Sequence, residues 1–224
     1  MPAAAIGEHD EALAIARSKL LARLPYNGAQ PFQANEHLSM TIQHAIVAFP
    51  TFDSSADIES VRRDFDPQAT LLPAHVTLVF PFIAAHDTAF LREHIVAAIA
   101  VMSPFDIAVA APSVEDGGYL FLRLTQGRER IVELHDRLYT GALRSHLLPE
   151  HPYEAHITVG RLDSSEALTT AAAAAKARLV SPLRGRIDAV SLFRLADGFG
   201  TVACTLPFSE PPDEHAVGDA GARP

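Results

Sequence analysis

The sequence contains only one cysteine, Cys204, so no disulfide can form within the chain. It has no run of about 18 uncharged apolar residues, which is the length that a membrane-spanning helix requires. Its N-terminal stretch does not match a signal peptide, because acidic residues precede the apolar positions and basic residues interrupt them. These absences predict a cytoplasmic protein without membrane contact.

Basic residues are also scarce. The chain has 18 Lys and Arg against 27 Asp and Glu, a net charge of −9 with histidines neutral. Proteins that bind long nucleic acids normally present a broad basic face. The charge therefore argues against that class, but it leaves room for a local basic pocket that holds a nucleotide or an RNA end.

The pattern along the chain divides it into three parts. Residues 1–40 carry leucines and alanines at helical spacing, then Pro and Gly, and predict an N-terminal helical appendage. Residues 210–224 are rich in Pro, Gly, Asp and Glu and predict a disordered acidic tail. Residues 41–209 are predicted to form the single folded domain.

Strands and helices alternate within that domain, which predicts an α+β protein. The expected strands are 44–49, 74–79, 105–110, 118–124, 155–160, 184–194 and 201–208. The expected helices are 54–65, 88–101, 128–144 and 164–177. A turn is expected at Asp197-Gly198, between the last two strands.

The triplet His-x-Thr occurs twice within these strands, as His75-Val76-Thr77 and His156-Ile157-Thr158. Side chains alternate between the two faces of a strand, so the His and the Thr of each triplet share a face. Two such strands could bring two imidazoles and two hydroxyls into one pocket. That set suits the binding of a phosphate and the transfer of protons around it.

Chance is a serious alternative. With 11 His and 12 Thr in the chain, about 0.6 such triplets are expected at random. Both triplets nevertheless lie in apolar runs, where a polar pair is costly unless it is hydrogen-bonded or functional. The residues alone leave two structural histidines as an equal alternative to a functional pair.

The surrounding sequence resembles bacterial 2′-5′ RNA ligase-like proteins of the two-histidine phosphoesterase superfamily. The stretches 45–50, 58–67 and 73–82 are similar to the first half of such a protein, and 153–161 is similar to its second motif. The resemblance covers residues 42–208. It implies a bilobal α+β fold, in which two antiparallel-rich sheets face a central cleft with helices outside, and each lobe contributes one His-x-Thr.

The resemblance implies acid–base catalysis at a phosphate by His75, Thr77, His156 and Thr158. An imidazole titrates near pH ~6.5, so one histidine can take a proton from water while the other protonates the departing ribose oxygen. The threonines would hydrogen-bond the non-bridging oxygens of the phosphate. Analogy with the family favours His75 as the acid and His156 as the base, an assignment that the sequence alone leaves open.

Substrate-binding candidates lie on the strand at 118–124. Alternation places Tyr119, Phe121 and Arg123 on one face of this strand and its leucines on the other. Arg123 could meet a phosphate, and an aromatic ring could stack on a base. The alternative is a solvated arginine beside a core aromatic.

Two further candidates flank the second motif. Alternation points Arg161 away from His156, unless a bulge at Gly160 redirects it toward the same face. Tyr153 could contact substrate, although an aromatic at such a position is more often part of the core.

No cofactor or metal is expected. His151 and His156, with Glu150 and Glu154 nearby, match no defensible metal-site spacing. The predicted function is a metal-independent phosphoesterase acting on a 2′,3′-cyclic phosphate or a 2′-5′ linkage of RNA or a nucleotide, with hydrolysis favoured over ligation. The expected partner is an RNA end or nucleotide carrying a cyclic phosphate. A non-catalytic nucleotide- or RNA-end-binding module and a purely structural protein are the alternatives.

Overall fold

The computed structural model describes residues 42–149, 152–196 and 199–209. The predicted appendage at 1–40, the predicted tail at 210–224 and the predicted turn at Asp197-Gly198 lie outside the described residues. No helix in the described part of the chain is long and apolar enough to cross a bilayer.

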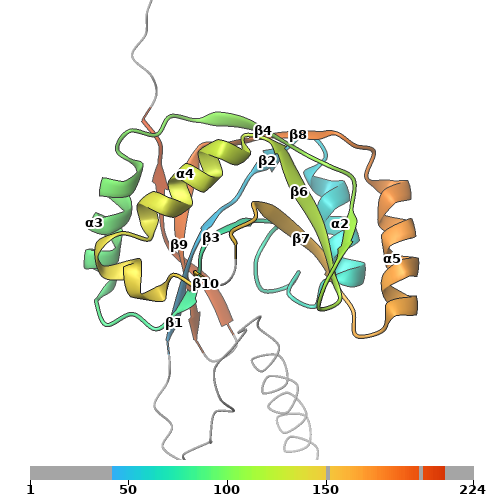
Figure 1. Cartoon of the computed structure of the whole chain (residues 1–224), viewed down its shortest axis with the longest axis horizontal. Helices are drawn as coiled ribbons and strands as arrows, with labels where there is room; N and C mark the ends of the chain where they lie inside the picture. Colours follow the sequence, from blue (N-terminus) through green and yellow to red (C-terminus); the bar gives the residue numbers. More distant parts are fainter. Residues whose placement is uncertain (1–41, 150–151, 197–198, 210–224) are drawn as a thin grey trace, which may run out of the picture.

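The strands form one curled antiparallel sheet with the order β10-β9-β1-β3-β7-β6-β4-β8-β2, and β5 pairs with β6 (Figure 1). A single register pair, Val76–Ile157, joins β3 to β7 in the middle of this order. We call β1, β3, β9 and β10 the first lobe, and the remaining strands the second lobe. The bounds are β1 Gln43–Ala48, β2 Thr51–Phe52, β3 Val76–Phe82, β4 Phe105–Val109, β5 Ser113–Glu115, β6 Tyr119–Gln126, β7 His156–Arg161, β8 Leu183–Ile187, β9 Ala189–Ala196 and β10 Phe199–Pro207.

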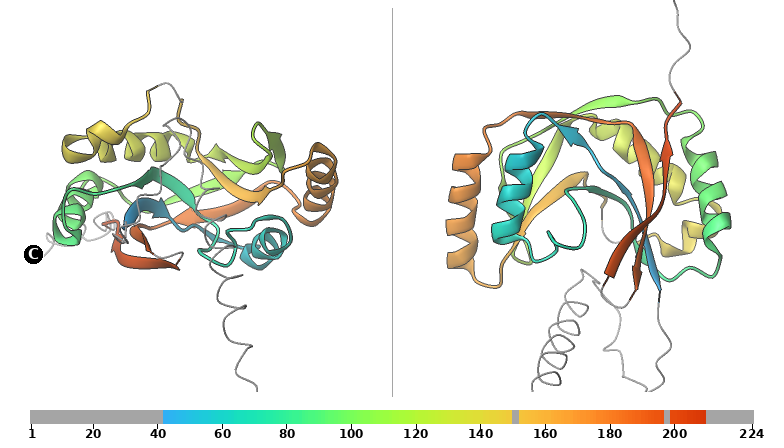
Figure 2. Two further views of the ribbon diagram at one scale, coloured as in Figure 1. Left: turned by 90° about the horizontal axis from the view of Figure 1, so that it is seen from below. Right: turned by 180° about the vertical axis from the view of Figure 1, so that it is seen from behind.

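In the part of the chain that the structure describes, four α-helices lie outside the sheet, two on each lobe (Figure 2). They are α2 Ser55–Phe65, α3 Thr88–Ile99, α4 Arg128–Leu138 and α5 Ser165–Arg178. The helix α2 precedes β3 in the chain but packs against β7, whereas α4 precedes β7 but packs against β3. The two halves of the chain therefore exchange a helix across the junction of the lobes.

Apolar side chains on the outward faces of the strands fill the space beneath these helices. Leu120, Leu122 and Leu124 on β6 are buried, as the alternation predicted. Two predicted helix starts are also confirmed, because Asp87 caps α3 by accepting from the Phe90 amide at 2.8 Å and Ser164 caps α5. The expected bilobal α+β architecture with outer helices is therefore confirmed.

Two of the predicted elements are each divided into two. The helix expected at 128–144 ends at Leu138, and a separate 3₁₀ helix, η1 Gly141–His146, follows. Gly141 has a φ of +51°, a conformation that breaks the helix. The strand expected at 184–194 is split at Asp188, because β8 pairs with β4 in the second lobe and β9 pairs with β1 in the first.

Candidate active site

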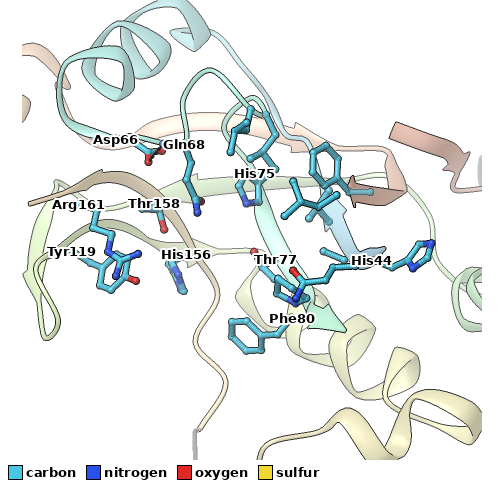
Figure 3. A pocket seen from close by; sticks show the side chains of 18 of the residues that line it. His44, Asp66, Gln68, His75, Thr77, Phe80, Tyr119, His156, Thr158 and Arg161 are labelled. Atoms are coloured by element: carbon cyan, nitrogen blue, oxygen red, sulfur yellow. Dashed lines mark hydrogen bonds between the residues drawn. The ribbon is translucent and has the colours of Figure 1, made fainter. Parts of the chain in front are cut away.

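The two His-x-Thr motifs lie on the two strands that meet at the junction of the lobes. His75 immediately precedes β3 and Thr77 lies on it, whereas His156 and Thr158 lie on β7. All four side chains line one cavity of about 320 Å³ (Figure 3). The fold therefore brings together the four residues that the sequence singled out.

Both imidazoles are fixed in the same way by the backbone. The Nδ1 of His75 lies 2.9 Å from the Pro73 carbonyl oxygen, and the Nδ1 of His156 lies 2.7 Å from the Glu154 carbonyl oxygen. A carbonyl oxygen can only accept, so Nδ1 carries the proton in each ring. The Nε2 atom of each histidine is left to exchange a proton with a bound molecule.

The pKa of His75 is lowered to about 4, chiefly by burial. The hydrogen bond to Pro73 and the charge of Glu59 raise this pKa, whereas the charges of Arg62 and His156 lower it further. His75 is accordingly neutral near pH ~7, and its Nε2 lone pair is available to accept a proton.

Burial also lowers the pKa of His156, but its charged surroundings differ. The carbonyl and the carboxylate of Glu154 raise this pKa, as does the carboxylate of Glu115, whereas the charge of Arg123 lowers it. Two carboxylates and one arginine thus act on His156, whereas one carboxylate and one buried arginine act on His75.

A β-bulge follows the threonine of each motif. On β3 the register with β1 passes from the pair Val47–Thr77 to the pair Ile46–Val79, so Leu78 has no partner. On β7 the register with β6 passes from the pair Phe121–Thr158 to the pair Leu120–Gly160, so Val159 has no partner. The extra residue reverses the alternation of the strand. As a result, the residue three positions after each threonine also faces the cavity.

These residues are Phe80 in the first motif and Arg161 in the second. The bulge on which the sequence prediction for Arg161 depended is therefore present. Gly160 is closely packed there, because a Cβ atom would lie 3.0 Å from Cδ1 of Leu120 and 3.1 Å from Cβ of Phe65, so a neighbouring side chain would have to move.

The two aromatic candidates of β6 line the same cavity. The ring of Phe121 stacks on the imidazole of His156 with centroids 3.7 Å apart. The ring of Tyr119 lies 5.0 Å from the guanidinium carbon of Arg161. Both rings therefore hold functional side chains of β7 in place, in addition to any contact with a ligand.

Arg123 does not line the cavity. Its guanidinium forms an ion pair with Glu115 at 2.5 Å and a second ion pair with Glu154. Both carboxylates bear on the pKa of His156. The structure thus places Arg123 beside the second motif as a bridge between two acidic groups, and its contact with a phosphate stays a prediction.

Tyr153 also lies outside the cavity lining. Its hydroxyl donates a hydrogen bond to the backbone carbonyl of Thr77 at 2.8 Å, and its ring stacks on His135 at 3.8 Å. Burial raises the pKa of Tyr153, so the phenol keeps its proton and remains a donor. The chain that leads into the second motif is thereby bonded to the strand of the first.

Sequence reasoning missed a charged cluster on α2. Arg62 is fully buried and pairs with Asp66 at 2.8 Å and with Glu59 at 3.1 Å. The guanidinium also donates to the carbonyl of Leu72 at 2.9 Å, and Glu59 accepts from the amide of Ala74 at 2.6 Å. The cluster therefore fixes the segment that leads into His75. Its only sign in the sequence was an arginine on the apolar side of an amphipathic helix.

No group of three His, Cys, Asp or Glu side chains that could hold a metal ion occurs among residues 42–149, 152–196 and 199–209.

Comparison with known proteins identifies relatives of this chain. A model of the 2′-5′ RNA ligase superfamily matches residues 50–198. A Bacillus licheniformis protein named "Putative phosphoesterase" is 25% identical over 122 residues, which cover 54% of this chain and 71% of that protein. A protein of the same name from Geobacillus thermodenitrificans is 27% identical over 125 residues, covering 54% and 69%.

A solved structure shows the same fold. The crystal structure of E. coli LigT in its apo form is 15% identical and has a TM-score of 0.50, with 77% of this chain and 100% of that chain covered. E. coli LigT has also been crystallised with 3′-AMP, and that structure has 16% identity, a TM-score of 0.45, and coverage of 75% and 99%.

Proposed function

Because the chain belongs to the 2′-5′ RNA ligase superfamily, we propose that it is a metal-independent phosphoesterase that hydrolyses a 2′,3′-cyclic phosphate or a 2′-5′ linkage of RNA or a nucleotide. The observation that carries this proposal is the shared cavity. Two imidazoles with free Nε2 atoms and two threonine side chains line it. A substrate phosphate bound there would meet an acid, a base and two hydroxyl donors.

In this mechanism His75 is the base. Its neutral Nε2 takes a proton from water, and the water oxygen forms a bond to phosphorus. The bond from phosphorus to one ribose oxygen breaks, and protonated His156 donates its Nε2 proton to that oxygen. The pKa of His75, lowered to about 4, suits a base, whereas analogy with the family favours the two roles the other way round.

The remaining polar groups would stabilise the charge on the phosphate. The hydroxyls of Thr77 and Thr158 would donate to the non-bridging oxygens, where negative charge grows in the transition state. The guanidinium of Arg161 would add a positive charge on the side of the second motif. Arg161 is the only Arg or Lys among the described residues that line the cavity, which favours hydrolysis of a small substrate over ligation of long RNA strands.

The test is a screen of the purified protein, with EDTA present, against nucleoside 2′,3′-cyclic phosphates and RNAs that end in a cyclic phosphate. We expect hydrolysis, with His75→Ala and His156→Ala each lowering kcat/KM by at least about 10²-fold. His86→Ala is the matched control, because this exposed histidine stacks on Phe90 and does not line the cavity.

Two outcomes contradict the proposal. If either cavity variant hydrolyses the substrate at the wild-type rate while remaining folded, the two-histidine mechanism is wrong. If the wild-type protein binds the cyclic phosphate saturably but releases no product, the chain is a binding module instead. The isomer of the product identifies which ribose oxygen leaves.

A further inference from the structure

Arg123 lies directly opposite His156, because the two residues are register partners on β6 and β7. Partners of this kind have their side chains on the same face of the sheet. His156 lines the cavity, whereas Arg123 does not. The guanidinium is bonded to two carboxylates instead, that of Glu115 on β5 and that of Glu154 just before β7. Arg123 is therefore next to a motif histidine but outside the space in which a phosphate would bind.

A continuous chain of hydrogen bonds leads from β5 to the imidazole of His156. The hydroxyl of Ser113 donates to Oε1 of Glu115 at 2.5 Å. Nε and Nη2 of Arg123 donate to the two carboxylate oxygens of Glu115 at 3.0 and 2.5 Å, and Nη1 donates to the carboxylate of Glu154. The carbonyl of Glu154 in turn accepts the Nδ1 proton of His156 at 2.7 Å. One guanidinium thus joins two carboxylates, and one of these belongs to the residue that orients the imidazole.

The segment before the first motif is held by a similar group of charges. Buried Arg62 pairs with Asp66 and Glu59. The carboxylate of Glu59 accepts from the amide of Ala74, which immediately precedes His75. In both lobes, an arginine that pairs with two carboxylates therefore fixes the backbone next to the motif histidine. The two groups differ in burial, since the arginine of the second lobe has a side chain that is 41% exposed.

We propose that Arg123 is a positioning residue that holds His156 in place through Glu154. Glu115 fixes the guanidinium from the other side, so that Nη1 stays on the Glu154 carboxylate. The Glu154 carbonyl then keeps Nδ1 of His156 bonded, and the Nε2 atom keeps its direction toward the bound molecule. A misplacement of about 1 Å can cost as much as about 10²-fold in rate. The inference rests on the proposed function, in which His156 donates a proton from Nε2.

The charges around the imidazole provide a second way to detect this role. Burial lowers the pKa of His156, and the carbonyl and carboxylate of Glu154 raise it. The charge of Arg123 lowers this pKa, and the carboxylate of Glu115 raises it. The other ionisable side chains among the described residues that line the cavity are those of His44, Asp66, His75, Tyr119 and Arg161. With these left in place, removal of the Arg123 charge should raise the pKa of His156, and removal of the Glu115 charge should lower it.

The test compares Arg123→Gln and Glu115→Gln with the wild-type protein. NMR titration of the His156 imidazole, assigned with His156→Gln, measures its pKa in the substrate-free protein and requires no turnover. We expect Arg123→Gln to raise this pKa by at least about 0.5 and Glu115→Gln to lower it. In steady-state kinetics on a nucleoside 2′,3′-cyclic phosphate, Arg123→Gln should lower kcat about tenfold and leave KM within about twofold of the wild-type value.

A conservative variant separates charge from geometry. Arg123→Lys keeps the positive charge, but an ammonium group cannot bind two carboxylates in the fork geometry of a guanidinium. It should keep the pKa of His156 close to the wild-type value and restore only part of kcat. The matched control is Arg137→Gln, because the Arg137 side chain is 40% exposed, pairs with Glu133 on α4 and does not line the cavity. This control should leave the pKa and kcat unchanged.

Ion pairs with this exposure contribute little to stability, so the variants should fold, and thermal unfolding checks that they do. If Arg123→Gln does not fold, the pKa in Glu115→Gln and kcat in Arg123→Lys decide the question.

The results separate the two proposals. If folded Arg123→Gln keeps the wild-type kcat, or loses kcat at an unchanged pKa of His156, the positioning role is overturned. If it raises KM at an unchanged pKa, Arg123 contacts the phosphate, as predicted from the sequence, and the positioning role is again overturned. If the wild-type protein hydrolyses no substrate, the phosphoesterase proposal fails, whereas opposite pKa shifts in the two variants would still show that Arg123 acts on His156.

Discussion

The hydrogen bond from Tyr153 to the carbonyl of Thr77 predicts a measurable coupling between the two motifs. The substitution Tyr153→Phe removes one oxygen atom and preserves the ring that stacks on His135. It leaves the Thr77 carbonyl without the phenol donor. This carbonyl lies next to Val76, whose register pair with Ile157 joins β3 to β7. We therefore expect the relative position of the histidines to loosen.

The magnitude follows from the loss of one buried partner. A carbonyl that is deprived of its donor costs about 1–3 kcal/mol, so the free energy of unfolding should fall by that amount. If about 1.4 kcal/mol of this cost appears as misplacement of the reacting groups, kcat falls about tenfold. KM should change less, because the side chains that line the cavity are unaltered.

The control is Tyr139→Phe. Tyr139 is also buried, and its hydroxyl accepts from the Phe80 amide at 3.1 Å, but it lies at the end of α4 and not on the chain entering β7. Denaturant unfolding and steady-state kinetics on a nucleoside 2′,3′-cyclic phosphate measure both effects. A Tyr153→Phe protein that loses stability as Tyr139→Phe does, yet keeps the wild-type kcat, would refute the coupling.

Four further predictions concern pH, the bulge and the buried cluster. The pH profile of kcat/KM should be bell-shaped, with both limbs below the ordinary imidazole pKa of 6.5. Activity is lost on the acid side as His75 becomes protonated toward pH about 4, and on the alkaline side as His156 loses its proton. A bell centred above pH ~7 would contradict the roles assigned here. The stability that neutral His75 contributes should be complete above pH 6.5 and lost as the pH falls from 6.5 to about 4, which urea unfolding at several pH values measures. Gly160→Ala should destabilise the protein by about 1–3 kcal/mol and lower kcat/KM, because the bulge that directs Arg161 must shift; wild-type values of both would show that the bulge tolerates a side chain. Arg62→Met should cost about 3–5 kcal/mol, since it leaves the buried Asp66 carboxylate without its cationic partner, and an unchanged urea midpoint would show that Asp66 finds another partner.

The sequence predicted the parts of the fold that depend on local pattern. The alternation of Leu120, Leu122 and Leu124 identified the buried face of β6, and Asp87 and Ser164 marked two helix starts. These features depend on neighbouring residues only. The pairing of β3 with β7 depends on contacts between residues about eighty positions apart, and it entered only through the resemblance to a family.

Other features could not be predicted because they depend on tertiary pairing. The break at Asp188 exists because β8 and β9 pair in different lobes, which no local signal reports. The two carboxylates that pair with Arg123 come from β5 and from the segment before β7. The alternation within β6 alone could therefore not predict these ion pairs. The sequence showed that Arg161 could face the cavity only if the strand had a bulge near Gly160. The bulge itself is established only by the register of β7 with β6.

The exchange of α2 and α4 between the lobes has a consequence for how the protein folds. Neither lobe is covered only by helices from its own half of the chain, because the helix that precedes each motif packs on the opposite motif strand. A fragment that ends between β6 and α4 would expose the outer face of β3. We therefore expect the lobes to unfold in one cooperative transition rather than in two, and hydrogen exchange in both motif strands to report the same opening free energy.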